Sequence, residues 1–440
     1  MTDISKTKQQ SKNDTAWEKL FLKYNILEEI SKTGFFEIES SSINEFRESR
    51  LMAKFDHYDT LPKIFKKNGL SILSISRNKY IIGKFDAYLK VIYDNKIEAI
   101  PVDFPTGIES IDYTNLYSES SALSCAFNTG IMNDLVNGED LYHTVYGRMS
   151  TGVFKFSINK IVDDLQHTIE VNNAQCEIDA GFESEHYFLL LEAKLYDVDD
   201  FLVRQLYYPY RLWSSKITTK EVIPVLMTYS NSTNIFSFFI YKFNDITNYN
   251  SIKLLEQRNY VIAPEIITHD DVDKIFNCVN LAPEPDNIPF PQADQFERII
   301  DLLTVLLDKE LTKEEITANY QFDERQTSYY TDAARYLNLM DKYVDQNTKQ
   351  ITFRLSSEGG NIIKKKYKTK ILCLIEQILK HQVFYKTFEF TLLDGKIPDT
   401  RVICDIMNSC SLNINPTTIK RRSSTVRGWI TWILNMLSDE

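Results

Sequence analysis

Four prolines in the eleven residues from Leu281 to Pro291 divide this chain into two parts of different character. Proline fixes φ and lacks an amide proton, so neither a regular helix nor a central strand passes through such a run. Before the run, segments rich in β-branched and aromatic residues predict strands, whereas after it apolar residues recur at helical spacing. We therefore expect a β-rich body, a linker over residues 281–293 and a helical C-terminal part.

The composition is that of an ordinary globular protein. Of the 440 residues, 43% are hydrophobic and 25% are charged, which excludes collagenous, low-complexity and wholly disordered chains. Six cysteines are too few for a disulfide framework in a chain of this length. No apolar run approaches the ~18 residues of a membrane helix, and the polar start has no signal-peptide core. We expect a soluble, cytoplasmic protein with no membrane partner.

Several common catalytic motifs are missing from the sequence. There is no GxxxxGK[ST] phosphate loop, no GxGxxG after a predicted strand and no HExxH. The six histidines are scattered along the chain, so a Ser/His/Asp or Cys/His site has no local support. Nucleotide-binding, zinc-protease and serine-hydrolase chemistry are all disfavoured.

Acidic residues interrupt two predicted strands in the middle of the chain. From about residue 150 the pattern is strand, strand, helix, strand, strand, with strands over 175–180 and 187–194 and a helix over 199–213. Glu177 and Asp179 lie on the first strand, and Glu192 and Lys194 end the second, otherwise apolar strand. Residues two apart share a face of a strand, so Glu192 and Lys194 project together, and a hairpin can bring Asp179 beside them.

Two carboxylates without histidine or thiolate partners suit a hard divalent cation such as Mg²⁺, which commonly uses one or two carboxylates plus substrate phosphate. A buried charge costs several kcal/mol unless it is paired or metal-bound, which favours a functional explanation. The alternative is a surface hairpin in which Glu192 and Lys194 form a simple salt bridge.

This pattern of an acidic residue, a spacer and Glu-X-Lys on the next strand resembles the PD-(D/E)XK nuclease superfamily. The resemblance implies that Asp179 and Glu192 bind Mg²⁺ and that Lys194 is the catalytic lysine, and it leaves open whether Glu177 joins the site. The helix over 203–211 is also similar to one found in these nucleases. Gln205 there would support Lys194 or contact a DNA phosphate, and Arg204 and Arg211 would contact phosphate.

The C-terminal part divides into two similar units, residues 294–368 and 369–440. The first has a helix over 294–307, a capping box from Thr312 to Glu315, a helix over 323–339 and a strand over 351–355. Three helices plus a hairpin is the winged-helix plan. We expect the second unit to repeat it, with helices from residue 370, over 398–410 and over 415–433.

Charge is concentrated in this part of the chain. The formal net charge is −11, yet residues 361–427 contain thirteen Lys and Arg against five Asp and Glu. Basic residues on a recognition helix fit phosphate contact and base readout in a DNA groove. The alternative is a solvated helix face. The expected DNA contacts are Arg325, Gln326, Tyr329, Lys420, Arg421, Arg422, Ser423, Thr425 and Arg427.

The expected fold class is an α/β (α+β) restriction-endonuclease-like core with a mixed sheet, an N-terminal α+β region and C-terminal tandem winged-helix domains. The expected boundaries are 1–145, 146–280, 281–293, 294–368 and 369–440. The first region would contact DNA or another subunit, and residues 55–65 and 80–83 are similar to N-terminal regions of type II restriction enzymes.

The expected function is a Mg²⁺-dependent, sequence-specific endonuclease that cuts double-stranded DNA, as type II restriction enzymes do. The resemblance also implies a homodimer and a companion DNA methyltransferase. The alternatives are a winged-helix DNA-binding regulator with a non-catalytic nuclease-like domain, and a repair or mobile-element nuclease.

Overall fold

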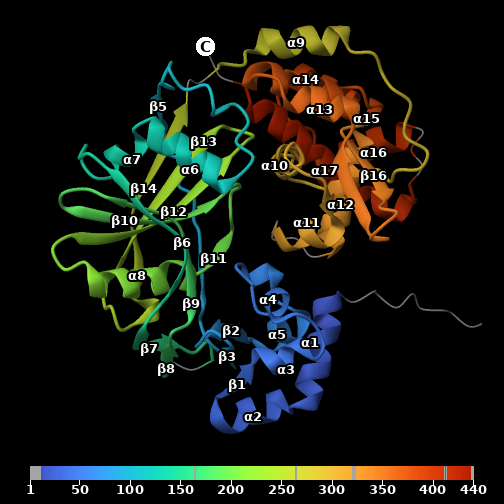
Figure 1. The fold of residues 1–440 in the computed structure, drawn as a ribbon. Coiled ribbons are helices and arrows are strands. Elements are labelled where there is room, and N and C mark those ends of the chain that lie inside the picture. Colours follow the sequence, from blue (N-terminus) through green and yellow to red (C-terminus); the bar gives the residue numbers. More distant parts are fainter. Residues whose placement is uncertain are drawn as a thin grey trace, which may run out of the picture.

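The computed structural model describes residues 11–162, 165–262, 265–319, 324–410, 412 and 414–437 (Figure 1). It is a mixed α/β protein with a seven-stranded mixed sheet, an N-terminal α+β region and a helical C-terminal part, which confirms the predicted fold class at this level. Within these ranges, no helix is both long enough and apolar enough to cross a membrane.

The N-terminal region packs short helices against a three-stranded sheet of order β1-β3-β2. Its elements are α1 (Lys12–Lys23), α2 (Ile26–Thr33), β1 (Phe35–Glu39), α3 (Ser40–Asn44), α4 (Ser49–Met52), η1 (Tyr58–Thr60), α5 (Lys63–Asn68), β2 (Ser71–Ser74) and β3 (Lys79–Gly83). Trp17 and Phe21 both meet Phe65 edge-to-face in the core, with ring centroids 4.8 and 5.3 Å apart. The break between α1 and α2 falls at Asn25, which has a left-handed backbone conformation (φ 50°). Asparagine tolerates this conformation better than most residues do.

The seven-stranded sheet has the order β5-β14-β13-β12-β10-β9-β6. Its strands are β5 (Ala99–Val102), β6 (Tyr142–Ser150), β9 (Gln175–Glu183), β10 (Tyr187–Lys194), β12 (Glu221–Ser230), β13 (Ile235–Phe243) and β14 (Ile252–Ile262). β10 pairs with β12 in parallel, as β5 does with β14, and the other neighbours are antiparallel. Because β5 and the first four residues of β6 precede residue 146, the sheet extends beyond the segment predicted as the nuclease core.

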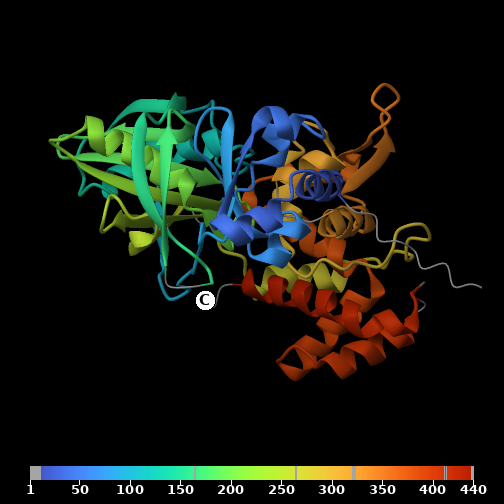
Figure 2. The same cartoon turned by 90° about the horizontal axis from the view of Figure 1, so that it is seen from below.

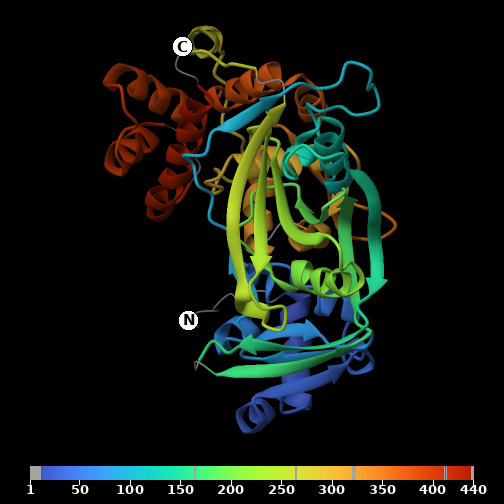
Figure 3. The same cartoon turned by 90° about the vertical axis from the view of Figure 1, so that its left-hand side faces the viewer.

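Helices cover both faces of this sheet (Figures 1 and 3). On one face lie α6 (Glu119–Asn128) and α7 (Ile131–Asp134), and on the other lies α8 (Arg204–Lys216). Alternation along β10 separates the two cores, since Leu189 and Leu191 pack with α6, whereas Phe188 and Leu190 pack with aromatic residues of α8. The remaining pieces of this part are β4 (Tyr88–Lys90), β7 (Val153–Asn159), β8 (Gln166–Asn172), β11 (Asp200–Leu202) and η2 (Tyr249–Ser251).

The helix predicted over 199–213 begins later than expected. Asp200–Leu202 forms β11, which pairs with β4, and α8 starts only at Arg204. Figure 3 shows the hairpin of β7 and β8 beside the N-terminal region, and isolated bridges join Ser76 to Asn172 and Phe85 to Lys160. Backbone contacts therefore join the N-terminal region to the β7–β8 hairpin.

The described residues of the first C-terminal unit form four helices and a small sheet of order β15-β17-β16. The elements are α10 (Glu297–Val305), β15 (Leu311–Thr312), α11 (Lys313–Asn319), α12 (Glu324–Tyr336), β16 (Met340–Val344), β17 (Ile351–Leu355) and α13 (Ser357–Ile363). The predicted capping box is confirmed, because the Thr312 amide donates to Glu315 Oε2 at 2.8 Å and the Glu315 amide to Thr312 Oγ1 at 3.3 Å.

The second C-terminal unit differs from its prediction. Its described residues form α14 (Tyr367–Leu379), α15 (Gln382–Asp394), α16 (Thr400–Ser409) and α17 (Pro416–Asn435), and no strand occurs among them. The expected hairpin is thus absent from the described residues, and the predicted second winged helix is wrong there. Instead α17 packs on α15 and α16, and α9 (His269–Cys278) packs on α14.

Two adjacent glycines of α13 provide a matched test of this packing. A Cβ on Gly359 would lie 2.0 Å from the Leu339 carbonyl oxygen, whereas a Cβ on Gly360 would meet nothing within 4 Å. We expect Gly359→Ala to lower the free energy of unfolding by about 1–3 kcal/mol through overpacking. Gly360→Ala should raise it by about 0.5–1 kcal/mol, because alanine is the better helix former. Chemical denaturation measures both, and equal effects would contradict the close contact.

Candidate active site

The centre of the site is the end of β10, which lies between β9 and β12 and is buried along its length. Glu192 and Lys194, at its end, are each only 7% exposed. Because Phe188 and Leu190 face α8, alternation places Glu192 and Lys194 on that same face. The strand therefore brings two ionisable side chains together in an otherwise apolar setting.

Asp179 reaches this pair because β9 and β10 separate there. The last paired residues are Leu191 and Ala180, and beyond them the Asp179 carboxylate takes over, accepting a hydrogen bond from the Ala193 amide at 2.8 Å. On its other side, β9 shifts register against β6 between Val145 and Gly147. A bulge of this kind bends a strand and re-aims its side chains. Here the bulge lies opposite Asp179, whose carboxylate is directed toward the end of β10.

Glu192 accepts hydrogen bonds from two side chains on the same oxygen. Lys194 Nζ donates to Glu192 Oε1 at 2.6 Å, and Gln205 Nε2, from the first turn of α8, donates to that oxygen as well. Gln205 was expected to support Lys194 or contact DNA; its recorded contact is with Glu192. The helix that follows the strand thus fixes the orientation of the central carboxylate.

The carboxylates of the site carry more negative charge than one ammonium can balance. Burial, with the nearby Asp179 charge, raises the pKa of Glu192 to about 7. Burial also raises the pKa of Asp179 to about 6, with Glu119 adding to the rise and Lys194 opposing it. For Lys194, burial alone would lower the pKa, but the carboxylates around it, Glu192 foremost, raise it well above its ordinary value.

Three further residues of the site, Glu119, Asp56 and His57, come from distant parts of the chain. Glu119 opens α6, and burial next to Glu192 raises the pKa of its carboxyl despite the opposing charge of Lys194. Asp56 lies in the N-terminal region. Burial acts to raise the pKa of its carboxyl, but the combined charges of Lys194, Lys54, Arg204 and His57 lower it. Sequence reasoning did not single out these residues, because only tertiary folding brings them to β10.

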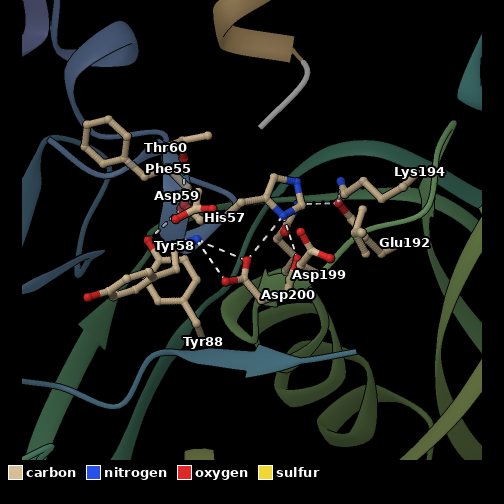
Figure 4. A network of polar contacts seen from close by, with 12 residues as sticks. Phe55, His57, Tyr58, Asp59, Thr60, Tyr88, Glu192, Lys194, Asp199 and Asp200 are labelled. Carbon is tan, nitrogen blue, oxygen red and sulfur yellow. Dashed lines mark hydrogen bonds and ion pairs between the residues drawn. The ribbon is translucent and has the colours of Figure 1, made fainter. Parts of the chain in front are cut away.

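His57 follows Asp56 and is 4% exposed. Its Nδ1 lies 2.6 Å from the Asp200 carbonyl oxygen, and because a carbonyl only accepts, Nδ1 carries the proton. Figure 4 shows the ring between Asp200 and the Glu192–Lys194 pair. The only feature of the sequence that pointed to His57 was the similarity of residues 55–65 to N-terminal regions of restriction enzymes.

Not every predicted residue joins the site. Glu177 is exposed and lies 3.3 Å from Arg148 Nε, on the neighbouring strand β6. Arg211 donates to the carbonyl oxygens of Lys155 and Ile246, at 3.0 and 2.8 Å. Arg204 is half-buried, with Nη1 3.4 Å from Ser74 Oγ and its guanidinium over the Tyr208 ring. Both arginine side chains therefore make structural contacts within the protein.

The residues predicted to contact DNA in the C-terminal part fall into two sets, those that are buried or bonded within the protein and those that solvent can reach. Ser423 and Thr425 are 2% and 0% exposed, and Thr425 donates to Asp294 Oδ1 at 2.6 Å, so their assignment as DNA contacts is wrong. Arg427 Nη2 donates to the Pro398 carbonyl oxygen at 2.6 Å. The other set lies at the surface or is half-buried: Arg325, Gln326, Tyr329, Lys420, Arg421 and Arg422.

The donor set fits a hard divalent cation held by few protein ligands. Within the described ranges, no hydrogen bond occupies Asp179 Oδ1 or Glu192 Oε2, which leaves one oxygen on each carboxylate. In the same part of the chain, no three His, Cys, Asp or Glu side chains are arranged to hold a metal by themselves. Mg²⁺ commonly binds through one or two carboxylates with water and substrate phosphate completing its shell.

These pKa shifts predict how a divalent cation stabilises the protein. Raised carboxyl pKa values mean that the folded state binds extra protons, so this contribution to stability is lost as pH rises through about 6 and 7. A cation binds the deprotonated carboxylates and should offset that loss. We expect Mg²⁺ to raise the melting temperature more at about pH 8 than at about pH 5.

Differential scanning fluorimetry at constant ionic strength measures this effect, with NaCl as the control. A shift that is equal at both pH values, or that NaCl reproduces, would contradict a cation site at Asp179 and Glu192.

Comparison with known families finds three matches, each a domain of unknown function. They are DUF6996 over residues 14–82, DUF6997 over residues 83–261 and DUF7226 over residues 298–438. No curated protein and no solved structure matches the chain. The second of these domains, DUF6997, contains Asp179, Glu192 and Lys194.

Proposed function

We propose that this protein is a Mg²⁺-dependent, sequence-specific endonuclease that cuts double-stranded DNA, of the PD-(D/E)XK type. The observation that carries the proposal is the meeting of Asp179, Glu192 and Lys194 where β9 and β10 part. A salt bridge on a surface hairpin, the simplest alternative, disagrees with the burial of Glu192 and Lys194, each 7% exposed.

The elements around the three residues support the resemblance as well. An acidic strand (β9), a short turn, a Glu-X-Lys strand (β10) and a Gln-bearing helix (α8) follow one another, and all of them contact. α8 contributes Gln205 directly to Glu192. The order of the residues along the chain and their arrangement in space thus favour the same assignment.

The chemistry follows from the charges of the site. A bound Mg²⁺ would polarise a phosphoryl oxygen and lower the pKa of a bound water. The Lys194 ammonium, buried beside Glu192, would stabilise negative charge on the phosphate. Asp179 and Glu192 would hold the cation, and Gln205 would keep Glu192 in place.

DNA recognition is assigned to the C-terminal part. The first unit has the three helices and hairpin of a winged helix, in which α12 corresponds to the recognition helix and carries Arg325, Gln326 and Tyr329. Lys420 and Arg421 on α17 would add phosphate contacts. By the same resemblance, the enzyme would act as a homodimer alongside a DNA methyltransferase, as a type II restriction enzyme does.

Incubation of the purified protein with plasmid and viral DNA and Mg²⁺, followed by sequencing of the ends, tests the proposal. Discrete fragments that share an end sequence support it. Non-specific nicking would indicate a repair or mobile-element nuclease, and binding without any cutting would indicate a DNA-binding regulator. Either of these results would overturn the proposed activity.

Variants of the site should separate cutting from binding. We expect Glu192→Gln and Lys194→Ala to lower the cleavage rate by at least about 10²-fold, because the first removes a carboxylate that would hold the cation and the second removes the ammonium that would stabilise charge on the phosphate. Gln205→Ala should lower it by about 10- to 100-fold, the usual effect of losing the support of a metal ligand. Binding of duplex DNA, measured by fluorescence anisotropy, should change little. Cleavage that survives Glu192→Gln would contradict these roles.

A further inference from the structure

A groove of about 490 Å³ runs between the N-terminal region and two C-terminal helices. Figures 1 and 2 show the N-terminal region beside α11 and α12, and Arg47 lies 3.3 Å from Glu314 across this boundary. The lining residues are Asp59, Lys66, Gln292, Arg325, Gln326, Tyr329 and Arg421. Three separate parts of the chain therefore build one site.

The groove is positively charged although the protein is acidic overall. Among the described residues that line the groove, Lys66, Arg325 and Arg421 stand against one carboxylate, that of Asp59, whereas the whole chain carries a net charge of −11. Among the described residues, no carboxylate pairs with Arg421. Next to it, burial and the Arg421 charge together lower the pKa of Arg422, against the opposing effects of Tyr329 and Asp332.

Lys66 keeps capacity for a ligand. Its Nζ donates to the Asp59 carbonyl oxygen at 2.6 Å and lies 3.6 Å from the Asp59 carboxylate. An ammonium has three donors, so these contacts leave it able to bind a phosphate oxygen. Gln292 Oε1 is buried without a hydrogen-bond partner among the described residues, and the phenol of Tyr329 and amide of Gln326 add polar groups to the lining.

The groove adjoins the candidate active site through one short segment. His57 lies beside Glu192 and Lys194, and Asp59, two residues later, lines the groove (Figure 4). Two residues span at most about 7 Å between Cα atoms. Phosphates on one DNA strand rise about 3.4 Å per nucleotide along the helix axis, so this step corresponds to roughly two nucleotides.

We propose that this groove binds the phosphate backbone of duplex DNA next to the scissile bond, with Lys66 of the N-terminal region as a phosphate contact. The inference rests on the proposed nuclease function and adds the N-terminal region to its DNA interface. The duplex would lie against α12 and α17 on one side and α5 on the other. Residues 55–66 would then connect the binding of the backbone to the position of His57.

Lys66→Ala and Lys67→Ala form a matched pair for the test. Both remove one positive charge from α5, but only Lys66 lines the groove, while Lys67 is exposed elsewhere on the helix. Duplex binding is measured over a range of salt concentrations in the Glu192→Gln background with Mg²⁺, so that the DNA is not cut. Thermal melting checks that both variants are folded.

We expect Lys66→Ala to weaken binding and to reduce the slope of log K against log salt by about 0.9, the value for one lost phosphate contact. Lys67→Ala should leave the slope unchanged. Equal slopes for the two variants would overturn the inference.

The outcomes distinguish this inference from the proposed function. If the wild-type protein cuts DNA and the two lysine variants bind alike, the nuclease assignment stands and the groove assignment fails. If the wild-type protein neither binds nor cuts duplex DNA, the proposed function fails first. A Lys66-dependent affinity for a deoxynucleoside monophosphate, without any effect on duplex binding, would assign the groove to a small nucleotide and overturn the proposal.

Discussion

The hydrogen bond from the Ala193 amide to the Asp179 carboxylate determines how this site can exist inside a sheet. It lies where the β9–β10 ladder ends, and it satisfies an amide that would otherwise be buried without a partner, at a cost of about 1–3 kcal/mol. The two strands can therefore separate without leaving this amide unpaired. Their separation leaves Asp179 beside Glu192 and Lys194, and α8 then adds Gln205.

Charge explains why this arrangement favours a ligand. Burial and crowding raise the pKa values of Asp179, Glu192 and Glu119, so the carboxylates are incompletely balanced by Lys194 alone. A divalent cation would balance the negative charge of the carboxylates. A phosphate would balance the positive charge of Lys194 and of the cationic groove. The net charge of −11 thus conceals two sites of opposite sign that lie close together.

Sequence reasoning located Asp179, Glu192, Lys194 and Gln205 because they lie within one hairpin and the helix that follows it. It did not identify Asp56, His57 or Glu119, which reach the site only through tertiary contacts. In α17, charge alone suggested DNA contacts at Ser423 and Thr425, yet Ser423 is three residues before buried Val426 and belongs to the same apolar face. The second winged helix was predicted from the succession of helices along the chain. That succession does not reveal whether a hairpin follows the helices.

The most direct test of the central claim is a titration with Mn²⁺, followed by electron paramagnetic resonance, of the wild-type protein and two variants of β9. Asp179 and Glu177 lie two residues apart, but Glu177 is paired with Arg148 at the surface. We expect Mn²⁺ to bind the wild-type and Glu177→Gln proteins alike, and we expect Asp179→Asn to abolish the binding. Equal binding by the two variants, or no binding by the wild-type protein, would contradict it.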